Sequence, residues 1–321
     1  MELTPELLDR RLLVFTGKGG VGKSTVAAAA ALLAAEQGKR VLAVEMDAKG
    51  DFTDYFEHPP VGFKPVEIHP GLSAMTMNTE ASLQEYLRLN LRIPLVGRIG
   101  PLAHAFELVA NAAPGVKEVL TMGKICYEVR EAIEGRAEWD LVVVDASASG
   151  HIISQLGSPK AIRELVHVGP VRAQTEWMHE VLSDPAITSL CIVTTPEEMP
   201  VSETIELVDR VEGDLDVSIG PIFVNRVLPE PFTRSDEEIF ERLREPELSA
   251  ALVGAAGSGV TAVMEAARLA VTMRRTRSAH LSRLRAAVDL PVAYLPFLFV
   301  RTHGMRVTRI MAEALGMELG L

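Results

Sequence analysis

The segment from Gly17 to Thr25 constrains the fold of this chain more than any other part of the sequence. It reads GKGGVGKST and follows the apolar run Leu12–Thr16, which is typical of a buried parallel strand. The residues after it, Ser24–Gln37, are rich in alanine and leucine and predict a helix that ends at Gly38. A glycine-rich turn between a buried strand and a helix indicates a phosphate-binding loop. We call residues 17–25 the phosphate loop.

The residue spacing inside this loop matches the pattern G-x-x-x-x-G-K-[ST]. Glycines let the backbone N–H groups curl around phosphate oxygens, and the start of the helix adds the positive end of its dipole. We expect Lys23 to reach the β and γ phosphates of a nucleotide and the Ser24 hydroxyl to ligate Mg²⁺. The residues predicted to bind the nucleotide here are Gly17, Lys18, Gly19, Gly20, Val21, Gly22, Lys23, Ser24 and Thr25.

Apolar runs and helical stretches alternate along most of the chain. The run Val41–Met46 completes a strand–helix–strand unit, which implies a parallel sheet. Further strands are predicted at Leu141–Val144, Leu190–Val193, Ile219–Val224 and Val292–Leu295, and helices at Ser202–Val211 and Thr261–Ala287. This order predicts a doubly wound α/β fold with a mostly parallel sheet, in one domain that covers residues 1–321.

Two segments interrupt the alternation. From Ser82 to Ala137 the pattern is helical, with Val119, Met122, Cys126, Val129 and Ile133 at steps of three and four. We expect a helical insertion at 82–137, joined by parts of 155–185 and 228–286. The second segment, 228–248, is charged, has prolines near both ends, and predicts a surface loop with a short helix.

Two side-chain groups in these regions allow more than one interpretation. Apolar residues crowd the stretch at 87–99, where they form either the core of the insertion or an exposed contact for a partner or a membrane. They are Leu87, Leu89, Leu91, Ile93, Leu95, Val96 and Ile99. The arginines of the helix at 261–287 predict a solvated face, with an acidic partner as the alternative.

Charge and cysteine content argue against several classes of function. The formal net charge of −11 disfavours nonspecific binding to DNA or anionic lipid, so we expect no nucleic-acid partner. Cys126 and Cys191 lie far apart, which argues against a CxxC metal site and favours a reducing compartment. The first residues do not resemble a secretory signal, and no uncharged apolar run reaches the roughly 18 residues that span a bilayer. We therefore expect a cytoplasmic protein.

Lys18 makes the phosphate loop similar to that of a known family. A lysine at this position, in GKGGVGKST, resembles the deviant Walker A loop of the arsenite-pump and tail-anchored-protein-targeting ATPases and their relatives. The resemblance implies that Lys18 reaches into the nucleotide site of a second subunit. A cation supplied in this way to the developing phosphoryl charge raises the rate of GTPases by about 10³–10⁵. The alternative is a solvated loop lysine.

Two further segments resemble the same family. DAKGDFTDYF, which begins at Asp47, is similar to the family segment DPAHSLSDAF, and this implies that Asp47 orients the attacking water. Asp51 stays an alternative because residues 48–50 differ from that segment. DASASGH, which begins at Asp145, is similar to the switch segment DTAPTGH and implies that Asp145 holds Mg²⁺ together with Ser24. Asp145, Gly150 and His151 would form the switch, although a histidine there is also common as a capping residue.

Three residues show weaker similarity to family residues that contact the nucleoside. Asn225, at the end of a predicted strand, matches a family asparagine that binds adenine, and Glu197 matches an acid that contacts the nucleoside. Pro296 lies in AYLPFL, which resembles the family loop over the adenine. Asparagine and glutamate at strand ends also commonly cap turns, so this alternative stays open for both residues.

The resemblance covers nearly the whole chain and is closest to the single-length, actinobacterial type of the family. It implies a Mg²⁺-dependent ATPase with Asp47, Lys18 and Lys23 as catalytic residues. It also implies a dimer with itself or with a paralogous ATPase subunit, and a protein client bound through the helical insertion. A peripheral membrane contact stays possible. Alternatives are a positioning ATPase on the membrane or nucleoid and a slow regulatory subunit of a heteromeric ATPase. Two dispersed cysteines do not make a metalloid site, and both are expected in the core.

Overall fold

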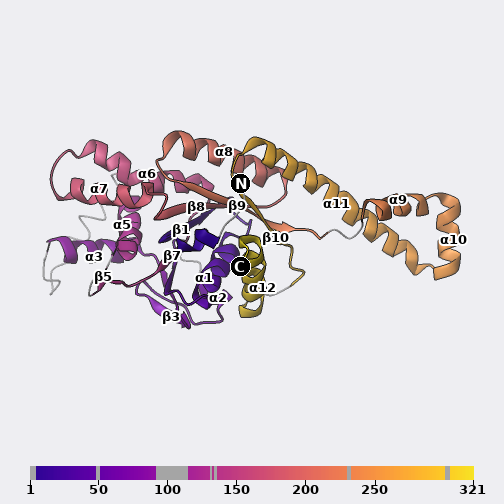
Figure 1. The fold of residues 1–321 in the computed structure, drawn as a ribbon, viewed down its shortest axis with the longest axis horizontal. Helices are drawn as coiled ribbons and strands as arrows, with labels where there is room; N and C mark the ends of the chain where they lie inside the picture. Colours follow the sequence, from indigo (N-terminus) through magenta and orange to yellow (C-terminus); the bar gives the residue numbers. More distant parts are fainter. Residues whose placement is uncertain are drawn as a thin grey trace.

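An eight-stranded sheet forms the centre of the computed structural model, and helices cover both of its faces (Figure 1). The structure describes residues 5–47, 51–91, 115–130, 132–133, 136–229, 233–300 and 304–321. The strand order is β10-β9-β8-β1-β7-β2-β4-β3, and every neighbouring pair is parallel except β3 and β4. The predicted doubly wound, mostly parallel sheet is therefore confirmed.

The strands agree closely with the apolar runs of the sequence. They are β1 Leu12–Thr16, β2 Val41–Glu45, β3 Val66–His69, β4 Leu72–Thr76, β7 Leu141–Asp145, β8 Thr188–Thr194, β9 Ile219–Val227 and β10 Val292–Pro296. Two short strands, β5 Ala132–Ile133 and β6 Arg136–Ala137, form a separate antiparallel pair. The hairpin β3–β4 was not predicted, because it lies at the sheet edge and β3 alternates polar and apolar residues with no buried side chain.

The described helices pack on the two faces of the sheet or extend beyond it. They are α1 Lys23–Glu36, α2 Asp51–Tyr55, α3 Thr79–Leu91, α5 Val116–Arg130, α6 Ser149–Leu165, α7 Pro170–Ser183, α8 Glu198–Asp214, α9 Arg234–Leu243, α10 Pro246–Ala256, α11 Gly259–Ala287 and α12 Met305–Leu319, preceded by a 3₁₀ helix at Pro5–Asp9. Helices α1, α2 and α12 share one hydrophobic core with the sheet. Helices α5, α6, α7 and α8 and the end of α11 share the other.

The apolar face predicted around Cys126 is confirmed. Met122, Cys126 and Val129 are buried in α5, and Val119 packs against the same core. Cys126 and Cys191 are both fully buried, as expected. The predicted helix is too long, however, because α5 ends at Arg130 and Ile133 lies in β5. The apolar stretch at 87–99 falls on residues or side chains outside the described part of the chain.

A buried lysine joins α3 to α5 within this helical region. Lys124 Nζ lies 2.7 Å from Glu85 Oε2 on α3 and 2.6 Å from Glu128 Oε1 on α5. Trp139 Nε1 donates a hydrogen bond of 2.9 Å to Glu128 Oε2. Each charge therefore has a partner, and burial of one charge alone would be strongly destabilising.

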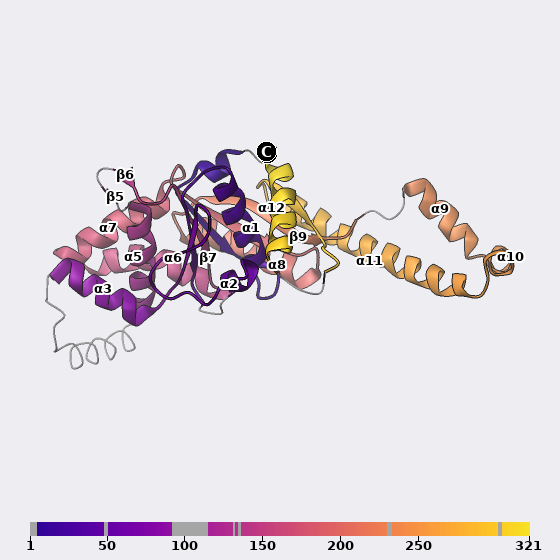
Figure 2. The same ribbon diagram turned by 90° about the horizontal axis from the view of Figure 1, so that it is seen from below.

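The short helix expected within residues 228–248 is present as α9, but a second helix, α10, also begins in this segment. Helix α9 fills much of this segment and α10 follows directly, so that α9, α10 and the first part of α11 form an arm that extends away from the sheet (Figure 2). Helix α9 begins with a capping box, in which Thr233 and Asp236 satisfy each other's backbone N–H groups. Helix α10 has no buried residue although its composition is apolar.

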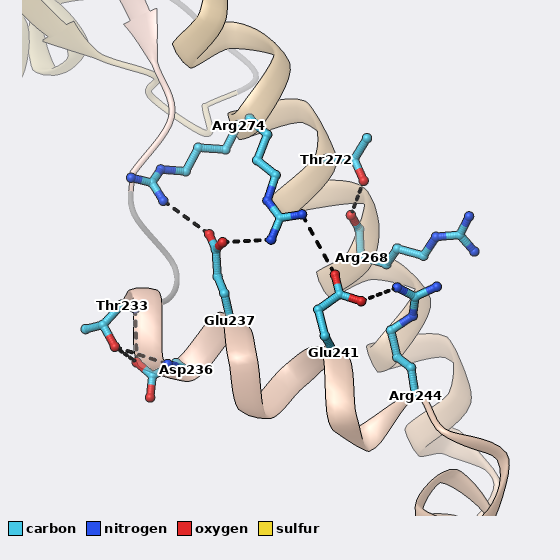
Figure 3. A network of polar contacts seen from close by, with 9 residues as sticks. Thr233, Asp236, Glu237, Glu241, Arg244, Arg268, Thr272 and Arg274 are labelled. Carbon is cyan, nitrogen blue, oxygen red and sulfur yellow. Dashed lines mark hydrogen bonds and ion pairs between the residues drawn. The ribbon is translucent and has the colours of Figure 1, made fainter.

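Arginines of α11 hold α9 in place. Arg274 and Arg275 both pair with Glu237, at 3.5 Å and 3.0 Å, and Arg275 also lies 3.9 Å from Glu241 (Figure 3). Closer to the sheet, Arg277 pairs with Glu197. The prediction of a solvated arginine face is therefore wrong for Arg274 and Arg277, whose side chains are 27% and 17% exposed.

We predict that Glu237→Ala loosens α9 without unfolding the sheet domain. The substitution removes both pairs of Glu237, and pairs of this exposure are worth about 0.2–1 kcal/mol each, so amide hydrogen exchange in residues 233–243 should quicken by about 2- to 30-fold. Hydrogen–deuterium exchange read by mass spectrometry checks this. Glu238→Ala, an exposed neighbour, is the matched control. Equal exchange in the two variants would contradict the role of Glu237.

Candidate nucleotide-binding site

The phosphate loop depends on glycine at several of its positions. Gly17, Gly20 and Gly22 have φ angles of 146°, 87° and 93°, a region that disfavours other residues. A Cβ atom on Gly17 would lie 2.0 Å from the carbonyl oxygen of Val193, and one on Gly22 would lie 2.3 Å from Asn225 Nδ2. The loop is therefore pressed against the ends of β8 and β9, and it leads into α1, whose first residues are Lys23, Ser24 and Thr25.

The register of the sheet brings the predicted site residues to one edge. Phe15 of β1 lies opposite Asp145 of β7, and Glu45 of β2 lies opposite Asp145 on its other side. Because parallel strands end at the same edge, the segments after β1, β2, β7, β8 and β9 meet around the phosphate loop.

Ser24 and Asp145, the predicted Mg²⁺ ligands, are in direct contact. Ser24 Oγ donates a hydrogen bond of 2.5 Å to Asp145 Oδ2, and Asp145 is buried at the end of β7. A hydroxyl and a carboxylate oxygen are ligands that Mg²⁺ accepts, so the two side chains fit this cation. No group of three or more metal-binding side chains occurs among the described residues. Phosphate oxygens and water would therefore have to supply the remaining ligands.

Asp47 is linked to the segment after β7. Ser147 Oγ donates a hydrogen bond of 2.8 Å to Asp47 Oδ1, and Gln155 Nε2 on α6 donates one of 3.0 Å to Ser147 Oγ. The competing residue Asp51 is described only as the first residue of α2, and its side chain lies outside the described part of the structure. Asp51 therefore stays an alternative to Asp47.

Lys18 is paired within its own chain. Its Nζ atom forms an ion pair with Glu203 Oε1 on α8, and the two side chains are 30% and 32% exposed. Ser149 Oγ, at the start of α6, lies 3.5 Å from the other oxygen of Glu203. The alternative of a freely solvated loop lysine is thus wrong for this structure. Lys23 Nζ lies 3.5 Å from the carbonyl oxygen of Lys18.

The residues predicted to contact the nucleoside lie in different surroundings. Asn225 is buried at the end region of β9 and donates a hydrogen bond of 2.9 Å to the Val21 carbonyl, so it touches the phosphate loop directly. Pro296 is the last residue of β10 and lies opposite Val227. Glu197 precedes α8, and its carboxylate lies 3.7 Å from Arg277 on α11. An open cavity of about 270 Å³ lies between the start of α8 and α11 and is lined by Pro196, Glu197, Glu198, Thr272, Met273, Thr276, Arg277 and His280.

Gly150 and His151 lie in the first turn of α6 and are exposed. A Cβ atom on Gly150 would meet no heavy atom within 4 Å, so packing does not require glycine there. The His151 backbone N–H donates a hydrogen bond of 2.9 Å to the Ala148 carbonyl. These two residues are therefore placed beside Ser149 at the rim of the site.

Three contacting residues were not singled out from the sequence: Ser147, Gln155 and Glu203. Ser147 lies within the switch segment, and Gln155 is a polar residue between the buried Ile152 and Leu156 of α6. Glu203 lies 185 residues from Lys18 in sequence, so no local pattern identifies it.

The two thiols have no place in this site. Complete burial raises the pKa of both Cys126 and Cys191 to about 12, so both remain protonated and neither is a thiolate ligand at neutral pH. Both lie in the hydrophobic cores, one on each face of the sheet. In the part of the chain that the structure describes, no helix is both long and apolar enough to cross a bilayer.

Comparison with known proteins agrees with this arrangement. The ATPase BagA of Mycobacterium tuberculosis H37Rv is 35% identical over 225 residues, which cover 68% of this chain and 66% of BagA. A putative arsenical pump-driving ATPase of Halobacterium salinarum is 28% identical over 268 residues, which cover 76% of this chain and 39% of that protein. The arsenical pump-driving ATPase of Escherichia coli is 29% identical over 257 residues, or 73% of this chain and 42% of that protein.

The chain thus spans just under two thirds of the length of BagA and about two fifths of the length of the pump ATPases. The family model described as anion-transporting ATPase matches residues 10–169 and 163–248, which include the phosphate loop and the ends of β2, β7, β8 and β9. The chain therefore belongs to the anion-transporting ATPase family.

Proposed function

We propose that this chain binds and hydrolyses ATP with Mg²⁺, and that it works as one half of a dimer whose nucleotide state changes the shape of its helical region. The observation that carries the proposal is the meeting of three polar units at one sheet edge: the glycine loop with Lys23, the pair Ser24–Asp145, and Asp47. Each has a role in phosphoryl transfer, which depends on positioning and on stabilisation of charge.

In this proposal the phosphate loop and the start of α1 bind the β and γ phosphates. The backbone N–H groups of the loop and Lys23 neutralise part of the phosphate charge. Ser24 and Asp145 would hold Mg²⁺, which would neutralise part of the charge that develops on the phosphates. Asn225 keeps the loop against β9 through its bond to Val21 and is the proposed contact to the base, with Glu197 and Pro296 as further contacts.

Asp47 is the proposed residue that orients the attacking water. Asp47 lies two residues after the end of β2, and β2 pairs with β7, whose last residue is Asp145. Asp47 would thus hold the water on the side of the phosphate loop where Asp145 lies. Positioning of the attacking group is a large part of catalysis in such enzymes.

Lys18 is the proposed link between two subunits. Within one chain it pairs with Glu203, so it has to leave Glu203 before it can reach the phosphates of a second subunit. Glu203 also accepts a hydrogen bond from Ser149, so release of Lys18 changes the contacts between α8 and the start of α6. This rearrangement would carry the nucleotide state to the helices. The second subunit is another copy of the chain or a paralogous ATPase.

The helical region is the proposed site for a protein client. We propose that residues 1–321 form one domain in which the insertion at 82–137, with α6, α7 and the arm, responds to the nucleotide. The arm exposes apolar side chains such as Val263 and Leu269, which are 65% and 60% exposed. A protein partner fits this surface better than a metalloid, because both thiols are buried, and better than a nucleic acid, because the net charge is −11.

The proposal predicts that Lys18→Ala retains nucleotide binding but loses turnover. The loop and Lys23 still hold the phosphates, whereas the cation supplied to the second site is gone, so turnover should fall by at least about 100-fold. Fluorescent nucleotide binding and phosphate release measure the two effects. Lys39 follows the C-terminal end of α1 and pairs with Asp9. Lys39→Ala should therefore change neither nucleotide binding nor turnover. Full turnover in Lys18→Ala would contradict the proposed role.

A second prediction concerns Glu203. Glu203→Gln weakens the pair that keeps Lys18 in its own chain, and each dimer contains two such pairs. Because a pair of this exposure is worth about 0.2–1 kcal/mol, the ATP-dependent dimer should form at a protein concentration lower by about 2- to 30-fold.

Sedimentation velocity with Mg²⁺ and a slowly hydrolysed ATP analogue measures this concentration. Glu206→Gln, an exposed residue on the same helix, controls for the lost charge. A weaker dimer in Glu203→Gln would mean that Glu203 does not compete with the second subunit for Lys18.

A further inference from the structure

Two side chains behind Asp47 form a short chain of directed hydrogen bonds. Gln155 Nε2 donates to Ser147 Oγ at 3.0 Å, and Ser147 Oγ donates to Asp47 Oδ1 at 2.8 Å. A hydroxyl has one proton to donate, so a bond accepted from an amide N–H leaves that proton directed at the carboxylate. The direction of both hydrogen bonds, from Gln155 to Ser147 and from Ser147 to Asp47, therefore follows from the donors and acceptors of the three side chains.

The backbone around this chain is held on two sides. Thr16 Oγ1 donates a hydrogen bond of 3.0 Å to the carbonyl oxygen of Ser147, which ties Ser147 to the end of β1. The backbone N–H of Met46 donates one of 3.1 Å to the carbonyl oxygen of Asp145, which ties the residue before Asp47 to the end of β7. Ser147 is also buried. The hydroxyl therefore has a defined position from which to orient Asp47.

Gln155 brings α6 into the same chain. It lies six residues after Ser149, the first residue of α6, whose hydroxyl contacts Glu203. The Oε1 atom of Gln155 is buried and has no hydrogen-bond partner among the described residues. Burial of a polar atom without a partner costs free energy of folding. The fold accepts this cost at Oε1 while Nε2 keeps its hydrogen bond to Ser147.

We propose that Ser147 and Gln155 are positioning residues for ATP hydrolysis: Ser147 orients the Asp47 carboxylate, and Gln155 orients the Ser147 hydroxyl. The inference rests on the proposed function, in which Asp47 places the attacking water. Neither residue needs to touch the nucleotide. Because α6 carries both Gln155 and Ser149, a shift of this helix when Lys18 leaves Glu203 would reach Asp47 through the same two hydrogen bonds.

The test is steady-state ATP hydrolysis by the full chain with Mg²⁺. Ser147→Ala removes the hydroxyl without added bulk, so kcat should fall by about 10- to 100-fold while KM and nucleotide affinity stay within about 2-fold of wild type. Ser147→Thr restores the hydroxyl and should recover most of kcat. Gln155→Leu should lower kcat by about 3- to 10-fold, and the double variant Ser147→Ala/Gln155→Leu should match Ser147→Ala alone because Gln155 acts through Ser147.

Two controls separate this inference from the proposed function. Ser154→Ala, on the exposed side of the same helix, should keep wild-type kcat. Asp47→Asn tests Asp47 itself. If Asp47→Asn loses turnover while Ser147→Ala keeps it, the positioning inference is wrong and the proposed function stands. If Asp47→Asn keeps turnover, Asp47 does not place the water, and both are wrong. A fall in kcat that Ser147→Thr does not rescue, accompanied by a lower Tm, would overturn positioning in favour of a purely structural role.

Discussion

The close contact between the phosphate loop and the ends of its neighbouring strands is the constraint on which the rest of the site depends. A Cβ atom at Gly17 would collide with the Val193 backbone, and one at Gly22 would collide with the Asn225 side chain. Only glycine permits both approaches, and it also supplies the positive φ angles that the loop needs. The loop is consequently held from β8 and β9 at once, while the Ser149 backbone N–H binds the Gly17 carbonyl at 3.1 Å. A change in any of these segments would therefore alter the shape of the phosphate loop.

The parallel register of the strands then brings polar side chains into contact around the phosphate loop. Because β7 lies between β1 and β2, the residues after it face the phosphate loop on one side and Asp47 on the other. Asp145 therefore meets Ser24, and Ser147 meets Asp47, although about 100 or more residues separate the partners. The same edge holds Lys18 against Glu203, so a cation proposed to act between subunits begins in a contact within one chain. In the proposed function, movement of α6 and α8 would follow the release of Lys18 from Glu203.

The sequence predicted what depends on local pattern and missed what depends on distant contacts. The buried parallel strands were predicted because they are continuous apolar runs, and the phosphate loop because its glycine spacing is specific. The edge hairpin β3–β4 has no such pattern. The segment at 228–248 was expected to be a loop with a short helix because it is charged and has prolines near both ends. The helix is present as α9, but its capping box and its pairs with arginines nearly 40 residues away were not predicted. The partners of Lys18 and Asp47 were missed for the same reason, since Glu203 lies 185 residues from Lys18 and Ser147 lies 100 residues from Asp47.

Lys18 of one copy is proposed to act in the nucleotide site of another. The most direct test mixes two variants, Lys18→Ala and Asp47→Asn, each expected to be inactive alone. In a mixed dimer, the site that retains Asp47 receives Lys18 from the other copy. Half of the dimers in an equal mixture contain one copy of each variant, and each of these has one complete site. About a quarter of wild-type turnover should therefore be recovered. Two variants that are inactive alone and show no recovery when mixed would contradict exchange of Lys18 between copies of this chain.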